Sequence, residues 1–148
     1  MMRGARWVCL ALLVVAAAGA GWVRFSPNDP ALWHADPLTI PDSQTPNFAR
    51  LAAGQITGPD IATLAKAADA AMRALPRTRL LAGSVAEGAM TYITRSALIG
   101  FPDFTSIRVM PDGDHATLVA FARARFGQSD LGVNAARLAV LQAALAPN

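Results

Sequence analysis

Four runs rich in strand-forming residues follow one another between residues 77 and 126, and only short turns separate them. Residues 77–86 and 89–98 flank Glu87-Gly88, and residues 105–110 and 115–126 flank a Pro-Asp-Gly-Asp segment. An Asp-Gly pair between two such runs is the strongest short-range signal for a hairpin. Because parallel pairs need long crossovers and none separates these runs, the sequence predicts a four-stranded, mainly antiparallel sheet of two hairpins.

Two segments with helical spacing flank these runs. Residues 59–75 carry apolar side chains at intervals of three and four, with Pro59 at the first helical position. Residues 133–145 show the same spacing and predict a closing helix. Alternation along residues 118–124 sends a leucine and three alanines to one side, a small apolar face that a helix approaches closely. The predicted fold is α+β: an N-terminal membrane helix, a helix, the four-stranded sheet, and a C-terminal helix packed on one face.

The N-terminal part of the chain is apolar enough to enter a membrane. Residues 7–23 form an uncharged run, which as a helix spans about 26 Å, near the lower limit for crossing a bilayer. Arg3 and Arg6 precede this run, so the positive-inside rule places the N-terminus in the cytoplasm. The sequence predicts a single-pass protein of the inner membrane with its C-terminal domain in the periplasm.

A cleaved signal peptide is the alternative reading of the same segment. Residues 16–21 are small, and Ala18-Gly19-Ala20 suits a signal peptidase. Cleavage near Ala20 would release the domain into the periplasm. Both alternatives export the domain.

The chain divides into three parts. Residues 1–24 are a membrane anchor or signal segment, residues 25–58 a proline-rich tether, and residues 59–148 the globular α+β domain. The prolines deny the tether a continuous helix or a central strand, so we expect it to leave the membrane extended and to wrap onto the domain. Residues 29–34 are predicted to form one short helical turn, and Trp33 is the side chain expected to dock.

The charge of the exported part argues against a nucleic-acid partner. The net charge is +3, but three of the thirteen basic residues lie in or beside the anchor and all ten acidic residues lie beyond it. The exported part is therefore balanced and lacks the basic footprint that nucleic acid requires. Cys9, the single cysteine, lies in the apolar run, and His34 and His115 are far apart in sequence. The sequence predicts no disulfide, no metal site and no cofactor.

Three arginines are predicted to line one face of the second hairpin. Arg123 and Arg125 alternate onto the same side of their strand, and a two-residue Asp112-Gly113 turn would place Arg108 opposite Thr117, on that same side. Arginine binds carboxylates and phosphates through paired N–H groups, so this cluster is a candidate site for an anionic small molecule or a lipid headgroup. The alternative is a structural ion-pair network.

Polar residues beside this face could take part either in an anion-binding site or in a structural ion-pair network. Asp103 and Asp130 lie in loops at strand ends, where they would neutralise the arginines in a network or serve as acid–base groups in an enzyme. Asp130 and Asn134 suit the cap of the closing helix, and the N–H groups there would otherwise bind an anion together with Arg137. No nucleophile–base pair is recognisable, which favours binding over catalysis. The candidate ligand-binding residues are Arg108, Arg123, Arg125, Asp103, Asp130, Asn134 and Arg137.

A set of short motifs is spread over the exported part of the chain: Asp29-Pro30-Ala31, Trp33-His34-Ala35-Asp36-Pro37, Thr94, Gly100-Phe101-Pro102-Asp103, Arg108, Arg123-Ala124-Arg125, Ser129-Asp130-Leu131-Gly132-Val133-Asn134 and Arg137. In these residues the chain resembles the family catalogued as domain of unknown function 1499. The resemblance covers most of the exported part and is densest from Thr91 to Arg137. Two positions depart from the usual pattern: Phe104 stands where a second acid usually follows Asp103, and alanines stand beside the paired arginines where serines are usual. The family's members look like small exported or membrane-attached bacterial proteins, and the resemblance implies no established activity.

Three functions of different classes fit these observations. The leading hypothesis is a membrane-anchored, non-enzymatic cell-envelope domain that binds an anionic small molecule, a lipid headgroup or an envelope protein. The second is an envelope hydrolase that uses Asp103 or Asp130 while arginines hold an anionic substrate. The third is a protein–protein interaction module, which would expose Phe104, Val119 and Phe121 as one patch.

Overall fold

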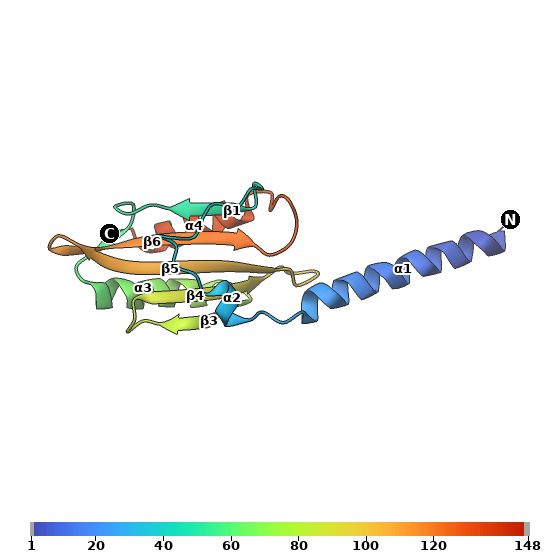
Figure 1. The fold of residues 1–148 in the computed structure, drawn as a ribbon, viewed down its shortest axis with the longest axis horizontal. Coiled ribbons are helices and arrows are strands. Elements are labelled where there is room, and N and C mark those ends of the chain that lie inside the picture. Colours follow the sequence, from blue (N-terminus) through green and yellow to red (C-terminus); the bar gives the residue numbers. More distant parts are fainter. Residues whose placement is uncertain (1, 147–148) are drawn as a thin grey trace.

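The computed structural model describes residues 2–146 and shows a long N-terminal helix that projects from a sheet-and-helix domain (Figure 1). Each helix and strand that the sequence predicts begins and ends within a few residues of its expected position. The elements in chain order are α1 (Met2–Phe25), α2 (Pro30–Trp33), β1 (Phe48–Leu51), β2 (Thr57–Gly58), α3 (Ile61–Ala74), β3 (Thr78–Ser84), β4 (Ala89–Arg95), β5 (Pro102–Asp112), β6 (His115–Ala124) and α4 (Val133–Ala144).

The strands form one antiparallel sheet of six strands in the order β1-β6-β5-β4-β3, with β2 also paired to β6. The α+β class, the antiparallel sheet and the C-terminal helix are confirmed, but the prediction of four strands is wrong. The two further strands come from the segment expected to be a tether. They are four and two residues long, too short for an alternating pattern to reveal, and they pair along the otherwise open edge of β6.

The β5–β6 hairpin turns one residue later than its sequence indicates. Asp112 pairs with His115, so Gly113 and Asp114 form the turn, and Gly113 takes the φ of 58° that this position favours. Arg108 therefore lies opposite Val119 and not opposite Thr117. Because the register differs by two residues, the same side chains remain on the same face.

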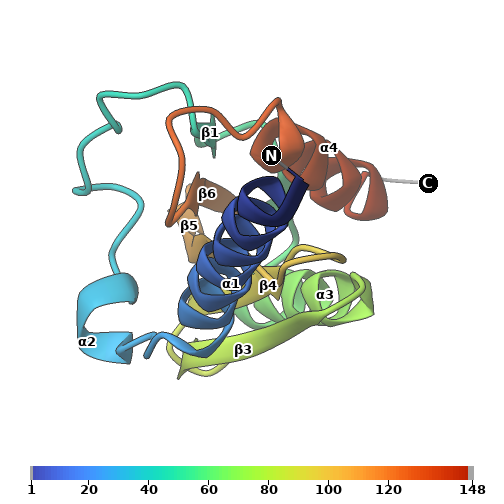
Figure 2. The ribbon, with the colours of Figure 1, turned by 90° about the vertical axis from the view of Figure 1, so that its right-hand side faces the viewer.

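Helices α3 and α4 cover one face of the sheet (Figure 2). Ala116, Ala120 and Ala122 of β6 are fully buried there, as their small side chains predict, whereas Ala124 at the end of the strand is half-buried. Asp60 caps the start of α3, since its Oδ1 accepts a hydrogen bond from the backbone N–H of Thr63 at 2.8 Å. The core on this side consists of Leu51, Ile56, Leu64, Ala65, Ala68, Met72, Met90, Tyr92, Ile107, Val109, Ala116, Leu118, Ala120, Ala122, Leu138 and Leu141.

The opposite face of the sheet, which we call the second face, is covered by residues 26–47. Trp33, at the end of α2, stacks on Phe104 with 4.0 Å between the ring centroids and 11° between the planes. The docking of Trp33 and the short helical turn around it are thus confirmed. Phe104, Val119 and Phe121 are buried beneath this segment, so the exposed patch that an interaction module would need is not present.

Helix α1 is the one helix within residues 2–146 that is long and apolar enough to cross a membrane. None of its apolar stretch, Arg6–Phe25, is buried inside the structure. A membrane anchor and a signal sequence share this length and composition, and both place α1 outside the folded domain.

Candidate functional site

The arginines of the second face contact residues 26–47. Arg108 forms an ion pair with Asp36, with 3.5 Å between Nη2 and Oδ2. Arg123 donates a hydrogen bond to the backbone oxygen of Trp33 at 3.3 Å, and its guanidinium lies 5.2 Å from the centroid of the Trp33 ring. Burial lowers the pKa of Arg123, as does the neighbouring charge of Arg50.

Two further arginines extend this row of contacts. Arg125 donates from Nη1 to the backbone oxygen of Pro27 at 2.7 Å and to Oδ1 of Asn28 at 2.8 Å. Arg50, on β1, pairs with Asp42, and its guanidinium lies 4.2 Å from the ring centroid of Phe121. The arginines therefore fasten the segment at points along its length. Neither Asp103 nor Asp130 neutralises the three arginines singled out from the sequence.

A histidine from the same segment reaches two hydroxyl groups of the sheet. A hydrogen bond of 2.9 Å joins Nδ1 of His34 to Oγ1 of Thr91, and a second of 3.1 Å joins Thr91 to Oγ of Ser106. The sequence does not indicate this contact, because His34 and Thr91 lie 57 positions apart. Thr91 and Ser106 are buried, so their hydroxyl groups are not open to a substrate, and the chain of bonds serves to position the segment.

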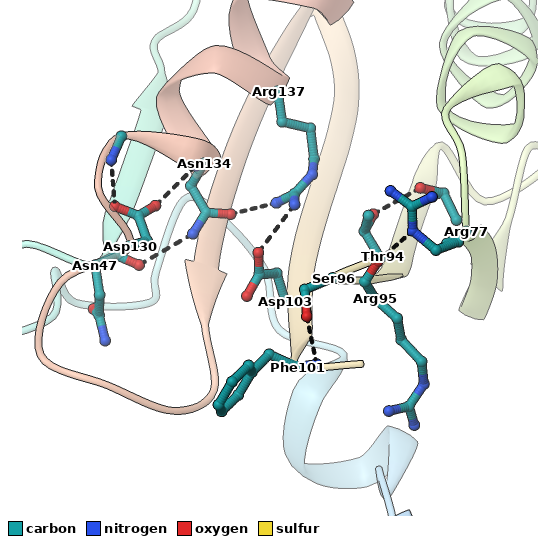
Figure 3. Close-up of polar contacts among 12 residues, drawn as sticks. Asn47, Arg77, Thr94, Arg95, Ser96, Phe101, Asp103, Asp130, Asn134 and Arg137 are labelled. Carbon is teal, nitrogen blue, oxygen red and sulfur yellow. Dashed lines mark hydrogen bonds and ion pairs between the residues drawn. The ribbon is translucent and has the colours of Figure 1, made fainter. Parts of the chain in front are cut away.

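The remaining candidate residues gather around a buried ion pair (Figure 3). Arg137 donates from Nη2 to Oδ2 of Asp103 at 3.0 Å and from Nη1 to Oδ1 of Asn134 at 2.5 Å. The side chains of Arg137 and Asp103 are only 8% and 15% exposed. Burial raises the pKa of Asp103, and the hydrogen bond and charge of Arg137 partly oppose that rise.

Asp130 and Asn134 tie the start of α4 to the sheet. The carboxylate of Asp130 accepts hydrogen bonds from the backbone N–H groups of Asn134 at 2.8 Å and Gly132 at 3.1 Å. Burial disfavours the Asp130 carboxylate, yet these two bonds hold its pKa below the usual value. Asn134 is buried and donates to the backbone oxygen of Asn47 at 3.2 Å. Asp130 thus binds backbone N–H groups at the start of α4, as expected, although the N-cap residue itself is Gly132 and Asn134 does not cap the helix.

A pocket of about 280 Å³ lies beside these carboxylates. Asp103 and Asp130 both line it, and much of the remaining lining is apolar. The structure thus brings four of the seven candidate residues, Asp103, Asp130, Asn134 and Arg137, into one cluster. It places Arg108, Arg123 and Arg125 apart from that cluster, in the row beneath residues 26–47.

A second pocket collects arginines that the sequence did not single out as a group. It has a volume of about 380 Å³ and lies where α1 meets the domain, next to the loop between β4 and β5. Arg24, Arg77, Arg79 and Arg95 all line it, and we call it the arginine pocket. Within residues 2–146, none of these four arginines forms an ion pair with an acid.

Backbone groups hold two of these arginines in place. Arg77 donates from Nε to the backbone oxygen of Arg95 at 3.0 Å (Figure 3). Arg95 donates from Nη1 to the backbone oxygen of Gly100 at 2.8 Å. Burial lowers the pKa of Arg95, and the nearby charges of Arg79 and Arg24 lower it further. Arg77 adopts a φ of 56°, a left-handed conformation that costs a residue with a Cβ about 1 kcal/mol or more. Like charges are therefore gathered at this point without a compensating acid.

Part of this pocket follows from the observed pairing of β3 with β4, which includes a register shift between Leu80 and Ala82. Thr78 pairs with Thr94, so Arg77 and Arg79 at the start of β3 flank the end of β4, where Arg95 stands. Alternation then places these side chains on the same face as Ile93 and Phe104. The contribution of Arg24 depends instead on how α1 leaves the domain. A side-chain carbon at Gly100 would lie 3.2 Å from Nη1 of Arg24.

Within residues 2–146, no three histidine, cysteine, aspartate or glutamate side chains lie close enough together to hold a metal ion. No curated protein matches the chain. The model of one family, described as protein of unknown function (DUF1499), matches residues 33–145. That range begins at Trp33 and includes most of the segment over the second face, the whole sheet and all of α4. The chain therefore belongs to the DUF1499 family.

Proposed function

We propose that this protein is a membrane-anchored, non-enzymatic binding module, and that the anionic group of its ligand binds in the arginine pocket. Helix α1 is the anchor in this proposal, with the domain on the periplasmic side of the inner membrane. Arg3 and Arg6 before the apolar run support that orientation through the positive-inside rule. An envelope ligand, either a small molecule or a lipid headgroup, would then meet the domain where it leaves the membrane.

The observation that carries the proposal is the convergence of Arg24, Arg77, Arg79 and Arg95 without an acidic partner. Gathering four like charges raises the free energy of the folded protein unless an anion offsets their repulsion. By contrast, Arg108 and Arg123 already bond to residues 26–47, so their guanidinium groups are less available to a ligand. Guanidinium groups bind phosphate and carboxylate oxygens through paired N–H donors.

We expect inorganic phosphate to raise the thermal midpoint of the full-length protein in an uncharged maltoside detergent. The Arg79→Ala variant should bind phosphate roughly tenfold more weakly, because a hydrogen bond to a charged group contributes about 1.5–3 kcal/mol. Arg79 is exposed, and within residues 2–146 it forms no ion pair, so this change should leave the fold intact. Isothermal titration measures the affinity.

Arg73→Ala is the matched control, since Arg73 is an exposed arginine on α3 that pairs with Asp69 away from the pocket. Its phosphate affinity should equal that of the wild type. Equal weakening in both variants would mean that phosphate responds to net charge alone, and the pocket would not be the site.

A hydrolase is the second candidate, and the pocket of about 280 Å³ beside Asp103 and Asp130 favours it. A carboxyl group whose pKa is raised by burial suits a general acid. In this alternative Asp103 would give or take the proton while Arg137 holds substrate charge. Turnover of cell-wall or phospholipid ester substrates that disappears in Asp103→Asn would establish catalysis and displace the binding proposal.

A further inference from the structure

We propose that the end of the domain nearest α1 is a membrane-docking surface, in which the arginine pocket binds the phosphate of a lipid headgroup and apolar loop tips enter the bilayer interface. This inference rests on the proposed function, because it names the source of the anion. It also assigns a membrane contact to the apolar loop tips, which the anion site by itself does not require. Figure 1 shows the relevant loops on the side of the domain from which α1 departs.

Two loops at this end expose large apolar side chains. Leu98, in the loop between β4 and β5, is 93% exposed, and Leu131, in the loop between β6 and α4, is 92% exposed. Ile99, Phe101 and Val133 in and beside the same loops are exposed as well. Apolar side chains gathered at one end of a domain mark a surface that contacts a protein or a membrane.

Hydrogen bonds within the two loops fix their backbones, and so fix the positions of these exposed side chains. Oγ of Ser96 accepts hydrogen bonds from the backbone N–H groups of Gly100 at 3.1 Å and Phe101 at 2.9 Å. In the other loop, the backbone N–H of Leu131 donates to Oγ of Ser129 at 3.2 Å. Leu131 has a φ of 54°, so its exposed side chain is held on a left-handed backbone. Such a conformation persists only where its surroundings enforce it, and it clusters at functional sites.

The connection to α1 keeps this end of the domain close to the membrane. Trp22 and Phe25, at the end of α1, are exposed, as aromatic residues are at a membrane interface. Ser26, directly after α1, is buried, and the backbone oxygen of Pro27 is bonded to Arg125. The chain therefore passes from the apolar helix into the folded domain within a few residues. No long tether separates the loop tips from the bilayer that α1 enters.

The distribution of charge fits an anionic bilayer as the partner. The arginine pocket lies at the α1 end, whereas the turns at the far end carry the exposed acids Glu87, Asp112 and Asp114 (Figure 1). An anionic leaflet attracts basic groups close to its surface and repels acidic ones. Asp103 and Asp130 also lie at the α1 end, but Arg137 pairs with Asp103 and backbone N–H groups bind Asp130. The unpaired charges at that end are therefore those of the arginine pocket.

The test places a polarity-sensitive fluorophore on single cysteines in the full-length protein with Cys9 replaced by alanine. The labelled variants are Leu98→Cys and Leu131→Cys at the loop tips, with Asp112→Cys at the far end as the matched control. Each is reconstituted with α1 intact into nanodiscs of phosphatidylcholine with phosphatidylglycerol. Quenching by lipids that carry a spin label near the headgroup then reports contact with the interface.

We expect strong quenching and a blue-shifted emission at positions 98 and 131, and neither effect at position 112. Adding Arg79→Gln should lower the ratio of docked to undocked domain roughly fivefold, the effect of removing one basic group near an anionic surface. Equal quenching at all three positions would overturn the docking surface. Quenching at the loop tips that is insensitive to Arg79→Gln would overturn the assignment of the lipid phosphate to the arginine pocket.

These failures are distinguishable from a failure of the proposed function. If inorganic phosphate binds in detergent but the loop tips stay unquenched, the anion site stands and the ligand is a soluble anion. Suppose instead that the loop tips are quenched, phosphate does not bind and Arg79→Gln has no effect. The apolar loops then dock on the membrane by themselves, and the proposed anion site in the arginine pocket is wrong.

Discussion

Replacing Arg137 by alanine should destabilise the protein by about 3–5 kcal/mol, because the change leaves the buried carboxylate of Asp103 without its charged partner. The two side chains meet at 3.0 Å and are only 8% and 15% exposed, so water does not substitute for the lost guanidinium. The same change removes the hydrogen bond that Arg137 donates to the buried Asn134. Urea unfolding of the full-length protein in detergent, followed by circular dichroism, measures the effect.

Arg73→Ala supplies the control for this measurement. Arg73 pairs with Asp69 at 2.8 Å, a similar distance, but its side chain is 51% exposed. An exposed pair at this helical spacing contributes only about 0.3–0.5 kcal/mol. A loss in Arg137→Ala no larger than that in Arg73→Ala would show that the Asp103–Arg137 pair is not a structural requirement.

The deficit of Arg137→Ala should also depend on pH. Burial already raises the pKa of Asp103 above its ordinary value, and loss of Arg137 removes the two effects that oppose this rise. A carboxyl group whose pKa is higher in the folded than in the unfolded state lowers stability progressively as the pH rises from the unfolded-state pKa through the folded-state pKa. The cost disappears when the pH falls below the unfolded-state pKa, because the group is then protonated in both states. The difference in unfolding free energy between variant and wild type should therefore be smaller at about pH 4 than at about pH 8. A difference that grows on acidification would contradict this assignment.

Replacing Phe104 by alanine should cost about 3–5 kcal/mol, the usual range for truncating a fully buried aromatic side chain. Phe104 is 0% exposed and lies between the sheet and the Trp33 ring, which stacks on it at 4.0 Å. The change should also loosen residues 26–47, because it removes the ring on which Trp33 of that segment stacks. We expect faster proteolysis within this segment than within the sheet.

Leu32→Ala is the control for Phe104→Ala, since Leu32 neighbours Trp33 but is 74% exposed. Its stability should stay within about 0.5 kcal/mol of the wild type. A double-mutant cycle of Phe104→Ala and Trp33→Ala should give a coupling free energy of about 0.5–1.5 kcal/mol. Independent effects of the two changes would mean that the stacked rings do not hold the segment.

Local patterns in the sequence were sufficient to predict the main helices and strands of the domain. The hairpin turns, the helical spacing of residues 61–74 and the alternating alanines of β6 are short-range signals, so the α+β class and the helix-covered face followed from them. The face of the sheet on which Arg108 and Arg123 lie was also predictable. Side chains alternate between the two faces, so an error of two residues in the strand register leaves each side chain on the same face.

The partners of those arginines were not predictable. Arg108 and Arg123 contact residues that precede them by 72 and 90 positions in the chain, and no local pattern encodes such a contact. The same holds for β1 and β2, which are too short to show a period and exist because β6 offers them an open edge.

The sequence by itself determined that an apolar helix precedes an α+β domain and which side chains share each face of the sheet, since propensity and periodicity act between near neighbours. Only the tertiary structure decided that Arg108, Arg123 and Arg125 fasten residues 26–47, while Arg24, Arg77, Arg79 and Arg95 form the arginine pocket. The physical reason is that a guanidinium group binds whatever acceptor the folded chain brings within a few ångströms. Which acceptor that is depends on long-range packing of the Trp33 segment and on the path by which α1 leaves the domain.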